Sequence, residues 1–150
     1  MKNSANSFSF TRAEDSTGFL LWQLTSFWQR EIKKTLEPLD LTHTQFVLLA
    51  SILWFTLQKK NVTQIILSSH TKIDTMTIST VLRILQAKDL INRQEHSTDS
   101  RAKTVALTDK GTKIVKKAIK KVELFDSYFF SKLKSKLTTF NENILTLLIE

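Results

Sequence analysis

The stretch that decides the fold is VTQIILSSHTKIDTMTISTVLRILQAKDLINRQEHSTDSRAKTVAL, residues 62–107. It predicts a short helix over 62–69, a turn that ends at Lys72, and a second helix that begins after Asp74, a residue type favoured as a helix N-cap. Behind this cap, apolar residues recur at three- and four-residue steps and share one helix face. They are Ile78, Val81, Leu82 and Leu85. The pattern predicts a helix-turn-helix unit.

The opposite face of the second helix is mostly polar, and most of its side chains are short. It carries Thr75, Met76, Thr77, Ser79, Thr80 and Arg83. Hydroxyls and a guanidinium can form hydrogen bonds with base edges in a DNA major groove. Taken alone, however, such a face is more typical of an ordinary solvated helix.

A basic hairpin is predicted directly after this helix. Two short strands, 90–93 and 104–107, flank a polar loop over 94–103 that carries Arg101 and Lys103. A helix-turn-helix followed by a basic hairpin is a winged helix, whose wing reaches the DNA backbone or a minor groove. The hairpin therefore moves the interpretation towards DNA binding.

Several motifs resemble the MarR-type (multiple antibiotic resistance regulator) winged-helix transcription factors, in family order over residues 20–150. They are Leu41-Thr42-x-x-Gln45-Phe46-x-Leu48-Leu49, the helix from Asp74 to Leu85, Leu90-Ile91-x-Arg93, Asp99-x-Arg101-x-Lys103, and Leu107-Thr108-Asp109-Lys110-Gly111. The Asp-x-Arg wing followed by Leu-Thr-x-x-Gly is the specific part of this resemblance.

The resemblance implies a homodimeric regulator that binds a palindromic operator in double-stranded DNA and is released by a small-molecule effector. Repression is the commoner mode of the family. The family's effector pocket lies between the dimer helices and the winged helix. Here it would lie near Trp22, Trp28, His43, Phe46 and Trp54, although each of these also suits an ordinary core position. A winged helix used for protein contact and a non-specific nucleoid-type DNA binder are the alternatives.

The DNA-binding hypothesis assigns a role to each polar side chain. The six residues of the polar helix face would contact the major groove. Arg101 would be the wing finger, oriented by Asp99 through a charge-assisted hydrogen bond, although the pair could also simply shape the hairpin. Lys72, Arg93 and Lys103 would contact phosphates.

The terminal segments are predicted to form dimerisation helices around a lobe at about 40–107. Residues 1–15 are a polar, flexible arm, and 16–150 form a single domain. A first helix over 16–36 and a last helix over 138–150 carry more apolar residues than one core needs. Between them lie a helix over 42–59, ended near Asn61, and one long helix over 108–137. The expected fold class is mainly α, with a small two- to three-stranded β wing.

Composition limits the remaining classes. The 150-residue chain has a net charge of +8 and an isoelectric point of about 9.8, which favours a polyanionic partner, although a lysine-rich genome could produce the same bias. No run of 18 apolar residues and no secretory signal is present, so a cytoplasmic protein is expected. With no cysteine, and with His43, His70 and His96 on separate elements, no metal, cofactor or enzymatic activity is expected.

Overall fold

A computed structural model of the chain describes residues 7–96 and 99–150, with the backbone alone at 95–96 and 99–102. The elements in chain order are η1 (Ala13–Asp15), α1 (Thr17–Leu36), η2 (Glu37–Leu39), α2 (His43–Leu57), α3 (Gln64–Thr71), α4 (Thr75–Ala87), β1 (Ile91–His96), β2 (Asp99–Leu107), α5 (Asp109–Phe130), η3 (Ser131–Lys136) and α6 (Leu137–Leu147). The expected fold class, mainly helical with a small antiparallel wing, is confirmed.

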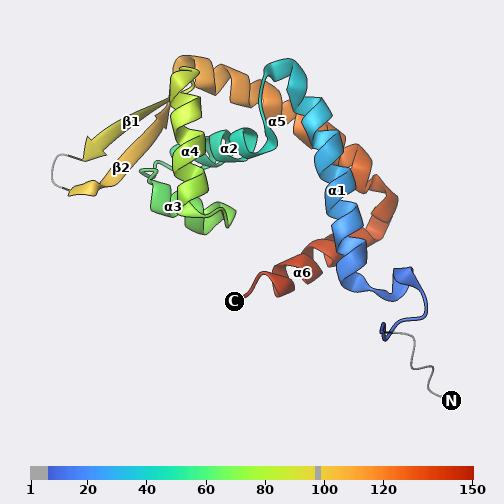
Figure 1. Ribbon diagram of the computed structural model, residues 1–150. Coiled ribbons are helices and arrows are strands. Elements are labelled where there is room, and N and C mark those ends of the chain that lie inside the picture. Colours follow the sequence, from blue (N-terminus) through green and yellow to red (C-terminus); the bar gives the residue numbers. More distant parts are fainter. Residues whose placement is uncertain (1–6, 97–98) are drawn as a thin grey trace.

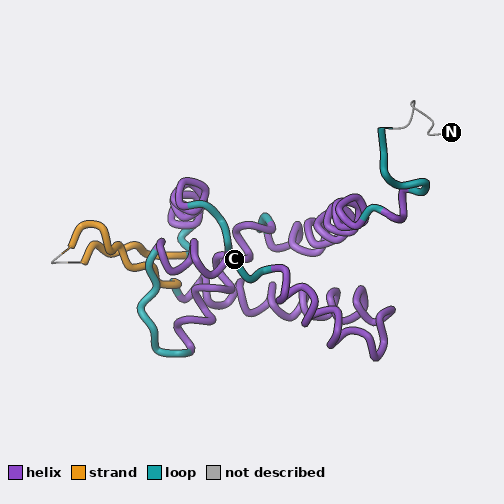
Figure 2. Tube along the Cα trace, turned by 90° about the horizontal axis from the view of Figure 1, so that it is seen from below, coloured by secondary structure: helices purple, strands orange, loops and turns teal. Residues whose placement is uncertain are grey.

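The molecule consists of a lobe and an arm (Figure 1). We call α2, α3, α4 and the β1–β2 wing the lobe, and α1, the far half of α5, and α6 the arm. Figure 2 shows the wing at the end of the molecule opposite the N-terminal segment. The N-terminal segment 1–15 was predicted to be flexible. Its residues 1–6 lie outside the described residues, while residues 7–15 are exposed and include η1.

The hydrophobic core fills the lobe and the near ends of α1 and α5. Its fully buried side chains are Ile32, Leu36, Leu48, Leu49, Ile52, Leu67, Ile78, Leu82, Leu85, Leu90, Ile91 and Val115. The predicted core face of α4 is therefore confirmed, with Val81 half-buried against the same cluster. By contrast, α1 buries only Ile32 and Leu36, and α6 buries none of its residues.

Besides α3, which Thr63 caps, four helices begin at side-chain caps, among them the Asp74 cap that was predicted from the sequence. The caps are Ser16 for α1, Thr42 with Gln45 as a complete capping box for α2, Asp74 for α4 and Thr108 for α5. Each cap accepts a hydrogen bond from a backbone N–H that would otherwise have no partner within the helix. These caps determine where the helices of the lobe start.

Helix α3 and the turn after it differ from the prediction. The helix starts at Gln64, two residues later than predicted, because Val62 and Thr63 join the wing. The carbonyl of Val62 accepts from the N–H of Val105 at 2.8 Å, and Thr63 forms a bridge with Thr104. Helix α3 then continues to Thr71, so the turn before α4 is shorter than predicted.

The helix ends rely on left-handed backbone at residues other than glycine. Asp89, which follows the end of α4, has a φ of 59°. The prediction that Asn61 turns the chain after α2 is wrong, because Lys59 takes this conformation with a φ of 57°. Lys72 does the same at the end of α3, with a φ of 63°.

The long helix is shorter than predicted. Helix α5 ends at Phe130 instead of continuing to 137, so its 22 residues span roughly 33 Å. The 3-10 segment η3 follows, and within it Lys134 has a φ of 51° and a ψ of −127°, which no helix tolerates. This break turns α6 back towards the lobe (Figure 1).

The wing strands extend further than predicted. Strands β1 and β2 pair antiparallel from Ile91↔Leu107 to His96↔Asp99, with a register shift between Gln94 and His96. Most of the predicted 94–103 loop is therefore strand. Residues 97–98 lie outside the described residues.

Candidate nucleic-acid interface

The polar face of α4 is open to solvent. Thr75, Met76, Thr77, Thr80 and Arg83 are exposed, and Ser79 is half-buried. Met76 is 81% exposed, although methionine is among the residue types most often found fully buried. Arg83 makes one bond among the described residues, from its Nε to the carbonyl of Ser79 at 3.4 Å. The face is available for contact with another molecule.

The N-terminal turn of α4 is held by Asp74. Its Oδ1 accepts from the Thr77 N–H at 2.8 Å and its Oδ2 from the Thr77 hydroxyl at 2.7 Å. The hydroxyl bond, and then the backbone bond, lower the pKa of Asp74 below its usual value, so the cap stays ionised at neutral pH. The Thr77 hydroxyl is consequently fixed in direction on the exposed face.

Lys72 lies in the turn immediately before α4. Its ammonium is 3.6 Å from a carboxylate oxygen of Glu150, near the end of the chain. Both side chains are well exposed, and such surface pairs contribute little to stability. Lys72 can therefore exchange this partner for another anion at little cost.

Arg93 connects the wing to α3. Its Nη2 donates to Gln64 Oε1 at 3.2 Å, and its Nε is buried without an acceptor. Within the described part of the chain, no carboxylate forms an ion pair with Arg93. A buried guanidinium N–H without a partner is unfavourable, so the Arg93 side chain would gain by moving to an anionic acceptor. The sequence singled out Arg93 but contained no signal for Gln64, which comes from another element.

The remaining wing residues are placed only in part. Asp99 and Arg101 belong to β2 by their backbone, but their side chains lie outside the described residues. Lys103 is described and half-buried on β2. The wing and α4 both connect to α3, through Gln64 and the short turn respectively.

Comparison with known proteins identifies the family. Residues 37–125 match the family model described as "ArnR1-like, winged-helix domain". The chain is 40% identical over 122 residues to the uncharacterized HTH-type transcriptional regulator YdcH of Bacillus subtilis, covering 81% of this chain and 83% of that protein. The chain belongs to the MarR-type winged-helix transcription regulators.

More distant relatives agree with this membership. The organic hydroperoxide resistance transcriptional regulator of B. subtilis is 25% identical over 76% of the MarR-type chain and 75% of its own length. Among solved structures, the fold resembles MepR of S. aureus in complex with DNA, with a TM-score of 0.80, 23% identity, and coverage of 91% of this chain and 97% of that one. CouR of Rhodococcus jostii bound to p-coumaroyl-CoA gives a TM-score of 0.77, 20% identity and coverage of 91% and 93%.

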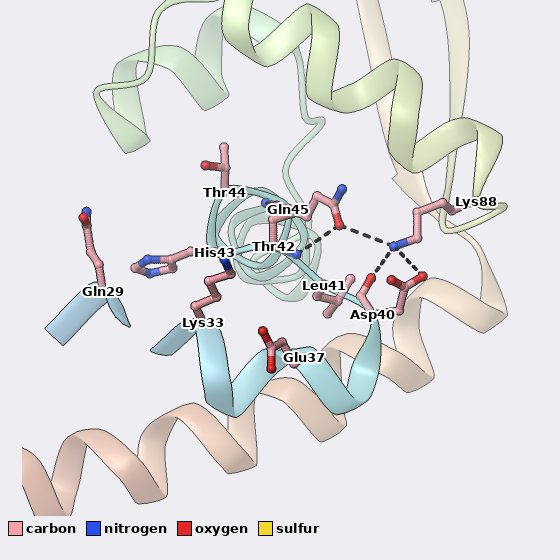
Figure 3. A pocket seen from close by; sticks show the side chains of 10 residues that line it. All are labelled: Gln29, Lys33, Glu37, Asp40, Leu41, Thr42, His43, Thr44, Gln45 and Lys88. Atoms are coloured by element: carbon pink, nitrogen blue, oxygen red, sulfur yellow. Dashed lines mark hydrogen bonds and ion pairs between the residues drawn. The ribbon is translucent and has the colours of Figure 1, made fainter. Parts of the chain in front are cut away.

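The five candidate effector residues of this MarR-type regulator do not all come together. Trp28 and His43 are in contact, edge to face at 5.0 Å between ring centroids. Phe46 is half-buried against the core. Trp22 and Trp54 are 71% and 58% exposed. Only His43 lines a hollow of about 510 Å³ between α1, the start of α2 and the end of α4 (Figure 3).

His43 lies where the arm of the MarR-type chain meets its lobe. The Trp28 Nε1–H donates to Asp126 Oδ1 at 2.9 Å, which joins α1 to α5 beside the imidazole. Burial lowers the pKa of His43 below its usual 6.5, and the Asp126 carboxylate opposes this in part. His43 is therefore neutral at pH 7.

The folded state is expected to lose stability in acid through His43. Below about pH 6.5 the unfolded chain binds a proton at this residue before the folded chain does, so the free energy of unfolding falls until the lowered folded pKa is passed. Urea denaturation at pH 7.5 and 5.5 measures the loss. A His43→Gln variant should show a smaller difference between the two pH values. An equal difference in the variant and the wild type would mean that His43 is not the cause of the acid destabilisation.

The described residues contain no group of three His, Asp or Glu side chains that could hold a metal ion. Over residues 7–96 and 99–150, no helix is both long and apolar enough to cross a bilayer.

Proposed function

We propose that the protein is a homodimeric, sequence-specific DNA-binding regulator that acts in the cytoplasm on a palindromic operator and represses transcription until a small ligand releases it. The observation that carries this proposal is the uncovered hydroxyl face of α4, next to a wing and an arginine, Arg93, that pairs with no carboxylate among the described residues. No catalytic step is part of the proposal.

The α4 face would read bases. Thr75, Met76, Thr77, Ser79, Thr80 and Arg83 would lie in the major groove, with Arg83 suited to guanine and Met76 to the thymine methyl group. Asp74 supports this role because it holds both the first turn of α4 and the Thr77 hydroxyl.

Three cations would bind phosphates. Arg93 is the strongest candidate, because its half-buried guanidinium is next to α3 and pairs with no carboxylate among the described residues. Lys72 would exchange Glu150 for a phosphate, and Lys103 would act from the wing. Arg101, oriented by Asp99, would extend the contact to the minor groove.

A two-fold dimer would bury the arm. The exposed apolar side chains of the arm are Phe19, Leu20, Leu21, Trp22, Leu24, Phe27, Leu124, Tyr128, Leu137, Ile144, Leu145, Leu147, Leu148 and Ile149. Such a surface is larger than the scattered apolar residues of ordinary monomers and marks an interaction site. Closed two-fold pairing is the commonest way to bury it, and it matches a palindromic operator.

Replacing Trp22 by glutamate is expected to convert the dimer to a monomer, because a charge would be buried in the interface. Size-exclusion chromatography with light scattering measures the mass. The matched control is Trp54→Glu, which alters an exposed tryptophan of the lobe and should leave the dimer intact. A wild-type monomer at micromolar concentration would refute the dimer.

Binding is expected to depend both on sequence and on salt. Fluorescence anisotropy with the protein's own upstream DNA and with random DNA of equal length should show a preference of about 10³-fold or more. Affinity should fall about 10³-fold or more between 50 and 200 mM salt if six or more phosphates are contacted. Salt dependence without preference would favour the nucleoid-type binder. Absence of binding would favour the protein-interaction module.

The regulator would respond to a small-molecule effector. The fold's likeness to CouR bound to p-coumaroyl-CoA supports a ligand-controlled regulator. The contact between Trp28 and His43 at the arm–lobe junction is the place where a ligand could alter the angle between the two parts. Trp22, Phe46 and Trp54 remain candidates for the same site in the dimer.

A further inference from the structure

The C-terminal end of α4 is anchored by Lys88. Its ammonium donates to the carbonyl of Asp40 and lies 3.3 Å from the Asp40 carboxylate and 3.4 Å from Gln45 Oε1 (Figure 3). The Lys88 side chain is only 28% exposed, but the Asp40 side chain is 97% exposed, so the carboxylate contact is screened like a surface pair. The bonds to the Asp40 carbonyl and to Gln45 are the ones that hold the ammonium in place. Lys88 therefore connects α4 to the segment between α1 and α2.

The acceptors of Lys88 are themselves held rigidly. Asp40 has a left-handed backbone with a φ of 53°, and its N–H donates to the carbonyl of Glu37 at 3.0 Å. Gln45 is 7% exposed and forms half of the α2 capping box, where its Oε1 accepts from the Thr42 N–H at 3.2 Å. Two of the oxygens that contact Lys88, the Asp40 carbonyl and Gln45 Oε1, are therefore held in place, and they link the segment between α1 and α2 to α4.

A second connection holds the same end of α4 to α5. The carbonyl of Lys88 accepts from Lys110 Nζ at 3.2 Å, and the carbonyl of Asp89 accepts from the Thr108 hydroxyl at 2.7 Å. The end of α4 is consequently bonded to the segment that follows α1 and to the start of α5. Both of these helices continue into the arm.

We infer that Lys88 is a positioning residue that fixes the angle of α4 against the arm, and so determines where each protomer's α4 face meets DNA. The inference rests on the proposed function. Base contacts need hydrogen-bond geometry, whereas long basic side chains reach phosphates over a range of angles. Loss of the Lys88 anchor should therefore reduce discrimination between sequences more than it reduces overall affinity.

The test is Lys88→Met, which keeps the stem of the side chain and removes the ammonium. Anisotropy is measured with own-upstream and random DNA over a salt series, at a temperature where the variant is folded. The affinity ratio of the two DNAs should fall about tenfold, and the slope of log affinity against log salt should change by much less than one. A lost phosphate contact would instead lower the salt slope by about one and weaken binding to both DNAs equally.

Matched variants separate positioning from other roles. Lys113→Met removes an exposed lysine of α5 and should leave the ratio unchanged. Asp40→Asn should also lower the affinity ratio, because asparagine tolerates the left-handed backbone and only the charge is removed. Combining it with Lys88→Met should have little further effect. Lys88→Arg should restore much of the ratio.

Amide hydrogen exchange without DNA provides an independent measurement. Residues 85–90 should exchange faster in Lys88→Met than in the wild type. Faster exchange with an unchanged ratio, or a slope lowered by about one, would overturn the positioning role while leaving the proposed function intact. A wild-type protein without sequence preference would instead refute the proposed function, and this inference with it.

Discussion

Replacing Gly111 by alanine is expected to destabilise the protein by roughly 3 kcal/mol or more. A Cβ at this position would lie 1.9 Å from the carbonyl oxygen and 2.8 Å from the carbonyl carbon of Leu90, both backbone atoms that cannot rotate away. Relief requires α5 to move away from Leu90, the residue just before β1. That movement would break the 3.1 Å bond from the Thr108 N–H to the same carbonyl.

Urea denaturation measures this loss, and the chain supplies its own control. Gly18 lies in the first turn of α1 with nothing within 4 Å of its would-be Cβ. Gly18→Ala should therefore leave stability unchanged or raise it by up to about 1 kcal/mol, because alanine favours helix. Equal stability of the Gly111→Ala variant and the wild type would mean that α5 does not pack on Leu90 as described.

Arg83→Ala is expected to weaken operator binding by about 1–3 kcal/mol, or roughly 5- to 150-fold, and to relax the preference at one base pair. The melting temperature should remain unchanged, because the single bond of Arg83 among the described residues is a long one to the Ser79 carbonyl. Anisotropy against operators substituted one base pair at a time locates the position that loses its preference.

The control for Arg83 is Arg30→Ala. Arg30 is an exposed arginine on α1 that stacks on Phe27, so its removal changes the net charge equally but far from α4. An equal loss of affinity in both variants would mean that Arg83 contributes only charge. Unchanged affinity in Arg83→Ala would remove this residue from the base-reading set.

The lobe was largely predictable from the sequence because local rules determine it. The three- and four-residue spacing from Ile78 to Leu85 identified the buried side of α4, and its exposed side follows from the same geometry. The capping residue Asp74 marked the start of α4 correctly. Each of these signals lies within a few residues of its effect.

The errors have equally physical causes. The apolar stripe of α5 continues through Phe129 to Leu133, so periodicity contained no stop signal where η3 begins. Lys134 and Lys59 adopt left-handed backbone without the Gly or Asn that usually marks it. The Lys88–Asp40 contact joins residues 48 positions apart, and a single sequence carries no signal for such a pairing.

The bonds at the root of the wing have a consequence for operator architecture. Val62 and Thr63, which lead into α3, are bonded to Val105 and Thr104 of β2, so the wing and the helix-turn-helix cannot tilt independently. The distance between the contacts that one protomer makes within its half-site is thus determined inside the lobe. In the proposed dimer, the distance between the two half-sites would depend instead on the arm, so natural variation in operator spacing should be concentrated at the centre of the palindrome.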